Sequence, residues 1–373
     1  MKRVRHLFPG NNTPKGFFSF YKFILGQREA NRIMCIKGGP GVGKSSFMMK
    51  IADEFIESGE EVDLMHCSSD PDSLDAVVLK NRKIAFIDAT SPHIVDPVTP
   101  GAVDNIIHLG EYWDEEGIRR NKKEVIECNE NIRAWFGRGY NYLAAAEKTY
   151  DLLADIYSSA VKPAEIYRIA ATIVVKELQH YEISLRPGNV KKYFASAITP
   201  KGFVNNLKDL AVNCNRIYLI SVPFGLSADR ILRVVSEGAV YRGFGVEEYY
   251  CPIKPDIMLE HLVIPELRTA FITVNEYHDV EPWQFGEEGD DYPEIRHIDL
   301  SDLVDETVIE KERRLILESR EFTDALMKKA IDCIAQAKKE HDVLEEYYIP
   351  NMDFKKIDAL RHEIVAKIRA EDV

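Results

Sequence analysis

Short apolar runs and helical periodicities alternate in the first ninety residues. Ile33–Ile36 is apolar throughout and stops at glycines, as expected of a buried strand in a parallel sheet. Residues 44–58 predict a helix, because their apolar positions recur at steps of three or four residues. Further strands are predicted at 61–67 and 84–88, with a turn and a helix start at 69–73 between them. This alternation predicts an α/β fold with a parallel sheet flanked by helices.

Later residues in each half change to a helical pattern. From about 121 to 182, and again from about 308 to 370, strand signals fade and apolar residues recur at helical spacing. We expect a helical hairpin or small bundle appended to each sheet. A coiled-coil arm is the alternative, although the heptad pattern is not clean. Pro187-Gly188 breaks any helix and predicts the link between the halves.

The chain also repeats itself at an interval of half its length. Thr13–Phe17 returns with the same five residues as Thr199–Phe203, an offset of 186. Other identical segments are Asn31-Arg32-Ile33 with Asn215-Arg216-Ile217 and Ala85-Phe86-Ile87 with Ala270-Phe271-Ile272. Nearly constant offsets over such a distance indicate a duplication. We therefore expect two domains of like fold, residues 1–186 and 187–373.

Composition narrows the classes of function. The 373 residues carry a net charge of −13, whereas a general nucleic-acid binder needs clustered Lys and Arg, so nucleic acid is not an expected partner. No stretch approaches the ~18 apolar residues of a membrane helix, and no apolar run of a signal peptide precedes Phe17. The six cysteines show no CxxC spacing. We expect a cytoplasmic protein with reduced thiols and no membrane partner.

The strongest chemical motif follows the first predicted strand. Gly38-x4-Gly43-Lys44-Ser45 has the spacing of a phosphate-binding loop, in which backbone N–H groups turn inward around a phosphate. A helix that starts at Lys44 directs its positive dipole end at the same phosphate. Lys44 is expected to reach the β- and γ-phosphates of ATP. The expected nucleotide-binding residues are Gly38, Gly39, Pro40, Gly41, Val42, Gly43, Lys44, Ser45 and Ser46.

A Mg²⁺ ion is expected beside the phosphates. Ser45 stands where such loops carry the hydroxyl that ligates the ion. Asp88 ends the apolar strand 84–88, and its carboxylate is expected to make the second contact with the ion. The next residue is Ala89, so the water-activating Glu that many ATPases have there is absent. The candidates in its place are His93, Asp96, Glu111, Glu115 and Glu116. His93 recurs as His278 in the second copy, which favours a structural role. The candidate catalytic residues are Lys44, Asp88 and His93.

The second copy lacks this chemistry. Lys44 corresponds to Ala228, Ser45 to Asp229 and Asp88 to Thr273, so the second loop is predicted to be a pseudo-site. Its retention suggests a packing partner that supplies a group to the first site, as arginine fingers do. The arginines considered for this role are Arg230, Arg242 and Arg268.

These motifs, together with Cys67–Asp75 and Asp88–His93, resemble those of a bacterial family of tandem P-loop NTPases. Its members come mostly from Firmicutes and are commonly labelled "ATPase" or hypothetical protein. The resemblance covers the whole chain, including the helical segments. It implies a duplicated P-loop NTPase fold, with ATP bound at Gly38–Ser45 and Asp88, and it implies no substrate.

The leading functional hypothesis is an ATP- and Mg²⁺-dependent ATPase or nucleotide switch whose helices relay the nucleotide state to an unidentified protein partner. One alternative is a P-loop kinase that phosphorylates a nucleoside or small metabolite. The absent glutamate is compatible with a kinase, because an acceptor hydroxyl replaces the attacking water there. Another is a nucleotide-gated scaffold with negligible turnover.

Overall fold

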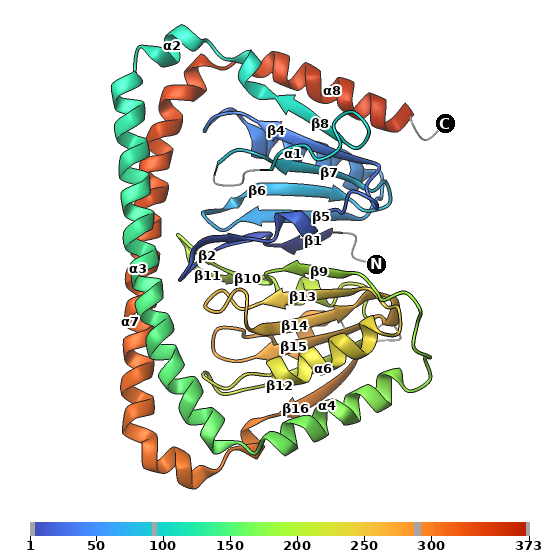
Figure 1. The fold of residues 1–373 in the computed structure, drawn as a ribbon. Helices are drawn as coiled ribbons and strands as arrows, with labels where there is room; N and C mark the ends of the chain where they lie inside the picture. The colour runs from blue at the N-terminus through green and yellow to red at the C-terminus, as the bar shows by residue number, and fades with distance from the viewer. Residues whose placement is uncertain (1–3, 92–94, 287–291, 371–373) are drawn as a thin grey trace.

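Each half of the sequence forms a six-stranded sheet, and the two sheets have the same strand order. The computed structural model describes residues 4–91, 95–286 and 292–370 (Figure 1). The first sheet has the order β1-β5-β6-β7-β4-β8, and the second, read from its corresponding edge, has the order β9-β13-β14-β15-β12-β16. Identical order in both halves supports the duplication that the sequence repeat predicts.

The strand boundaries also correspond between the halves. The first sheet contains β1 (Val4–Leu7), β4 (Arg32–Lys37), β5 (Val62–Cys67), β6 (Asp70–Leu79), β7 (Ile84–Asp88) and β8 (Asp104–His108). The second contains β9 (Val190–Tyr193), β12 (Arg216–Ser221), β13 (Val246–Tyr250), β14 (Leu259–Ile264), β15 (Thr269–Val274) and β16 (Glu294–Asp299). A hairpin follows each first strand: β2 (Gly10–Thr13) with β3 (Gly16–Ser19), and β10 (Ser196–Thr199) with β11 (Gly202–Asn205).

The sheets are mixed, which corrects the expectation of wholly parallel sheets. Strand β6 runs antiparallel to both of its neighbours, β5 and β7, and β14 does the same in the second half. The helix start expected at 69–73 is also wrong, because β6 begins at Asp70. The β-branched run at Val77-Val78 favours a strand, and six successive residues of this strand, 74–79, are buried. The burial of this apolar run favours a strand more strongly than the residues at 69–73 favour a turn.

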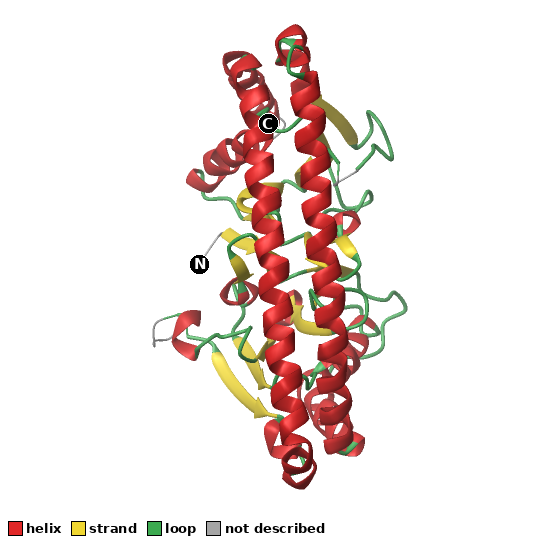
Figure 2. Ribbon diagram, turned by 90° about the vertical axis from the view of Figure 1, so that its left-hand side faces the viewer, coloured by secondary structure: helices red, strands yellow, loops and turns green. Residues whose placement is uncertain are grey.

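The long helices cross between the halves. Helices α3 (Lys122–Ala160) and α7 (Glu306–Tyr348) run side by side and antiparallel along both sheets (Figures 1 and 2). Each then turns onto the sheet of the other half. Helix α4 (Pro163–Leu178) packs against α6 (Asp229–Val240), and α8 (Phe354–Ala370) packs against α1 (Lys44–Glu57). The expectation of a separate helical hairpin in each half is therefore corrected.

The apolar cores explain this crossing. Ile357, Val365 and Ile368 of α8 are buried in the core of the first sheet, although they belong to the second half of the sequence. Ile166 and Ile173 of α4 are buried in the core of the second sheet. An amphipathic helix must bury its apolar face, and α4 and α8 each bury theirs against the sheet of the other half. The predicted boundary at 186/187 thus separates the sheets but not the helices.

Reciprocal contacts join the two halves. Lys15 pairs with Asp256 at 2.6 Å, and Lys201, the repeat partner of Lys15, pairs with Asp72 at 2.5 Å. Asp72 is therefore an ion-pair partner within β6. The buried Arg5 guanidinium contacts Asp63 of its own sheet and Glu247 of the other, each at 2.8 Å. Such paired contacts are what an approximate two-fold axis between the halves produces.

Short elements complete the described chain. They are α2 (Glu115–Arg119), α5 (Leu207–Leu210) and the 3-10 turns η1 (Tyr21–Phe23), η2 (Leu109–Tyr112), η3 (Pro265–Leu267), η4 (Pro282–Phe285), η5 (Ser301–Leu303) and η6 (Ile349–Asn351). Of the helices that the structure describes, none combines the length and the apolar character that crossing a membrane requires.

Candidate functional site

The predicted phosphate loop joins the carboxyl end of β4 to the start of α1. Gly41 and Gly43 have φ angles of +65° and +85°, in the left-handed region that glycine adopts without strain. Gly43 is the residue immediately before α1, so the first helical residue is Lys44, as expected. Val42 is fully buried and packs inward, whereas Ser46 is exposed on the first turn of the helix. The loop therefore presents backbone and the side chains of Lys44 and Ser45.

Lys44 and Asp88 lie together, as the sequence predicts for a phosphate and metal site. Strand β7, which ends at Asp88, is the direct neighbour of β4. The Lys44 Nζ donates to the carbonyl oxygen of Gly39 at 2.8 Å and lies 3.6 Å from the Asp88 carboxylate. Both side chains are largely buried, with 12% and 14% exposed. The mouth of the glycine loop therefore holds a largely buried cation beside a carboxylate.

Neighbouring polar groups hold this pair in position. The Asp88 carboxylate accepts a hydrogen bond from the Thr90 amide at 2.9 Å, and the Thr90 hydroxyl donates to the Gly38 carbonyl at 3.0 Å. The Ser45 hydroxyl accepts from the Leu74 amide at 3.0 Å. An oxygen that accepts one hydrogen bond keeps a second lone pair, so Ser45 stays able to ligate a metal. His93, the remaining candidate, lies outside the described residues.

The end of α7 covers the loop, which sequence reasoning did not anticipate. The Gly41 amide donates to the Glu345 carboxylate at 3.2 Å, although the residues are 304 positions apart. A methyl group on Gly39 would come within 2.9 Å of the Tyr348 ring, and one on Gly43 within 3.3 Å of Phe354. The sequence shows these three residues only as parts of helical patterns.

His341, one turn before Glu345, completes this contact. Its Nδ1 lies 3.7 Å from the Glu345 carboxylate. Burial lowers the pKa of His341 and outweighs the opposing effect of the Glu345 carboxylate, while the Lys338 and Lys44 ammonium groups add to the lowering. Its imidazole is therefore largely neutral at pH 7, and the Glu345 carboxylate gains little charge compensation from it.

The equivalent loop of the second half is filled by its own side chains and is covered by α3 of the first half, where Leu153 and Tyr157 lie against Gly225. The Asp229 carboxylate accepts from the Leu259 amide at 2.8 Å, which is the same contact that Ser45 makes with Leu74. Asp229 also pairs with Arg233 at 2.8 Å. Ala228 is buried and Thr273 bonds to the backbone of Glu260. Ala228 and Thr273 stand at the positions of Lys44 and Asp88, and the pseudo-site stays a prediction.

The arginines considered for a role in trans lie elsewhere. Arg242 donates to the backbone of Leu178 and Tyr181, and Arg268 donates to the backbone of Asn213. Arg230 lies over the ring of Tyr167 on α4. All three surround the second sheet. The second-half side chain that accepts a hydrogen bond from the phosphate loop is an acid, Glu345.

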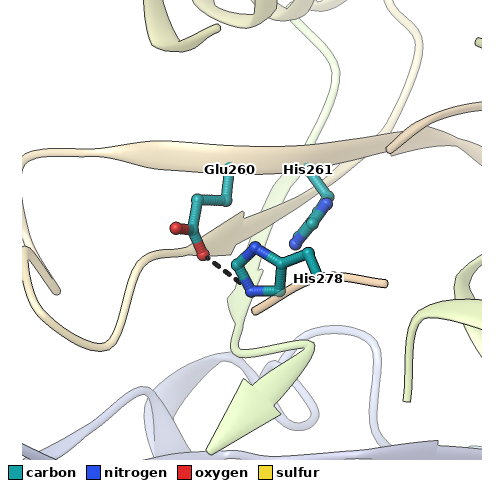
Figure 3. A group of neighbouring side chains, drawn as sticks. All are labelled: Glu260, His261 and His278. Atoms are coloured by element: carbon teal, nitrogen blue, oxygen red, sulfur yellow. Dashed lines mark ion pairs between the residues drawn. The ribbon is translucent and has the colours of Figure 1, made fainter. Parts of the chain in front are cut away.

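A buried polar cluster lies beside the second loop (Figure 3). It consists of Glu260 and His261 on β14 and His278 after β15, and the His278 Nε2 lies 3.5 Å from the Glu260 carboxyl. Glu260 is the extra residue of a bulge, since Tyr249 pairs with His261 and Tyr250 with Leu259. The bulge lets two consecutive side chains point to the same region.

The hydrogen bonds of this cluster argue against a three-ligand metal centre. The His261 Nδ1 accepts from the Thr273 amide at 3.1 Å, so the neutral ring carries its proton on Nε2, the nitrogen that would have to bind the metal. Burial raises the pKa of Glu260 to about 8 and lowers that of His278 to about 3, which leaves all three side chains uncharged at pH 7. The adjoining cavity, about 30 Å³, has room for a couple of water molecules and not for a nucleotide.

Comparisons with known proteins give no match: neither a protein-family model, nor a curated protein, nor a solved structure is similar to this chain. The family resemblance of the motifs therefore stays a prediction, and the function has to be argued from the loop itself.

Proposed function

We propose that this chain binds ATP with Mg²⁺ at Gly38–Ser46 and acts as an ATPase or nucleotide-dependent switch. The observation that carries the proposal is the 3.6 Å approach of Lys44, at the start of α1, to Asp88, at the end of β7, beside a loop with left-handed glycines. In this assignment the loop amides and Lys44 hold the phosphates, and Ser45 and Asp88 hold the metal shell. The bound Mg²⁺ would neutralise phosphate charge.

The switch form of this proposal draws further support from α7. This helix begins at Glu306 near the second sheet and ends at Tyr348 beside the phosphate loop (Figure 1). A rigid helix of 43 residues that contacts the loop is a direct mechanical connection between the nucleotide site and the other half. Among the described residues, no contact favours the kinase or the scaffold in the same way.

The test is ATP binding by the full chain and two variants in the presence of Mg²⁺, measured by titration calorimetry. Lys44→Ala should weaken binding by at least about ten-fold, because one charge-assisted contact to phosphate contributes about 1.5 kcal/mol or more. Asp229→Asn, at the corresponding helix start of the pseudo-site, should leave affinity unchanged. Circular dichroism of each variant checks that it folds.

Two results would count against the proposal: no ATP binding by the unmodified chain, or equal affinity of the unmodified chain and Lys44→Ala. Phosphate release by the unmodified chain then separates the ATPase from the switch, since the switch needs binding alone.

A further inference from the structure

We propose that Glu345 is a built-in competitor for nucleotide phosphate, so that α7 and the nucleotide exclude each other from the loop. The inference rests on the proposed function, and it concerns the regulation of the same site. Its basis is the contact between the Gly41 amide and the Glu345 carboxylate, 3.2 Å long, which puts an acid from the second half on a phosphate-binding amide of the first.

The chemistry of the contact is that of the expected ligand. A phosphate loop attracts anions through converging amides, a helix N-terminus and a lysine. A carboxylate, like a phosphate group, is negatively charged and offers oxygen atoms that accept hydrogen bonds. Glu345 therefore satisfies the loop in the way that a phosphate oxygen would. Because one N–H donates to one acceptor at full strength, and because carboxylate and phosphate repel each other, the two cannot share Gly41.

The contact is also placed so that it can open. The Glu345 side chain is 32% exposed, so solvent is available to it once it leaves the amide. It lies in the last turn of α7, directly before η6, where Pro350 prevents the helix from continuing. Movement of this end would also withdraw Tyr348 from Gly39 and Ile349 from Gly41. Asn351 and Asp353, which follow, are bonded to the backbone of Asp114 and Tyr112, so the displacement that uncovers the loop is confined to the last turn of α7. The rest of α7 stays paired with α3.

Competition of this kind couples the site to the second half. Linkage requires that whatever draws the α7 end away from the loop raises nucleotide affinity, and that nucleotide binding in turn releases α7 by the same factor. The pseudo-site copy then has a function: it carries the helix that reports the nucleotide state.

The first test compares ATP affinities of the full chain with those of Glu345→Gln and Glu346→Gln. Glu345→Gln keeps the shape but removes the negative charge, so ATP should bind about five- to ten-fold more tightly. Glu346 is exposed on the same turn and serves as the matched control, with no expected change. Unchanged or weaker binding by Glu345→Gln, with normal binding by the unmodified chain, would overturn the competition and leave the proposed function intact.

The second test follows the α7 end directly. Trp113 lies against Tyr348, with ring centroids 6.3 Å apart, and it also contacts Gly39. In a Trp135→Phe, Trp283→Phe background, Trp113 is the single tryptophan, and ATP should change its emission. The change should be lost in Lys44→Ala. If ATP binds calorimetrically without altering Trp113 emission, α7 does not move and the inference fails. If neither the unmodified chain nor Glu345→Gln binds ATP, the proposed function itself fails.

Discussion

The two corresponding loops share backbone contacts but differ in a few side chains. Ser45 and Asp229 make the same hydrogen bond to the next strand, with Leu74 and Leu259 respectively, so the backbone geometry survives the exchange. What differs is charge. A carboxylate at the helix start repels phosphate, whereas a hydroxyl does not. The difference in charge between the two loops is therefore decided by a few side chains on a common backbone.

Glu260 supplies a pH prediction at the same scale. Its pKa of about 8 in the folded chain lies above the value of about 4.3 in an unfolded chain, because burial disfavours the carboxylate. A raised folded-state pKa means that its stabilisation is fully present below pH ~4.3 and is lost as pH rises to 8. Gln cannot ionise, so Glu260→Gln should gain stability relative to the unmodified chain over this window, by on the order of 5 kcal/mol at pH 8.

Urea unfolding at several pH values between 4.5 and 8.5 measures this gain. Glu321→Gln, at an exposed position of α7, is the control and should follow the unmodified chain throughout. Parallel pH curves for Glu260→Gln and the unmodified chain would show that Glu260 is not held protonated.

At the scale of elements, the α3–α7 pair depends on a small residue at one position of α3. Gly139 is buried in α3 at the crossing with α7, and a Cβ there would lie 3.4 Å from the Ala330 carbonyl oxygen and from the Ile334 side chain. That is just within ordinary van der Waals contact, so alanine fits and a larger side chain does not. Small residues at such points let helix backbones approach closely.

Two substitutions at this position should act in opposite directions. Gly139→Ala is expected to stabilise the protein by up to about 1 kcal/mol through helix propensity. Gly139→Leu is expected to destabilise it by about 1–3 kcal/mol through overpacking. Gly137 on the exposed face, with nothing within 4 Å of its Cβ position, is the matched control, where Ala and Leu should both stabilise. Unfolding midpoints in urea decide the matter, and a stabilising Gly139→Leu would refute the close packing.

At the scale of the whole molecule, the crossed helices should make the halves unfold together. Each sheet is covered by a helix from the other half, and a third apolar cluster contains residues of both halves, such as Leu7, Met65, Tyr249 and Ile272. Neither half can lose its structure without exposing the core of the other. One cooperative transition is therefore expected where two like domains would ordinarily give two.

Calorimetry of core variants tests this cooperation. Ile357→Ala in α8 and Ile173→Ala in α4 each create a cavity in the core of a different sheet. Each should lower the free energy of unfolding by about 2–5 kcal/mol and shift the same single transition to a lower temperature. Val175→Ala, on the exposed face of α4, should change little. Two separated transitions, with each variant shifting only one, would contradict the interlocked arrangement.

The sequence by itself determined the duplication, the strand–loop–helix placement of Gly38–Ser45 and the neighbourhood of Lys44 and Asp88. These follow from local patterns: glycines set backbone angles where they stand, and apolar runs mark buried strands. Only the tertiary structure decided the antiparallel course of β6, the exchange of α4 and α8, and the contact of Glu345 with Gly41. The physical reason is that an amphipathic pattern shows which face of a helix is buried but not what buries it, and a carboxylate 304 residues away carries no local mark of its partner.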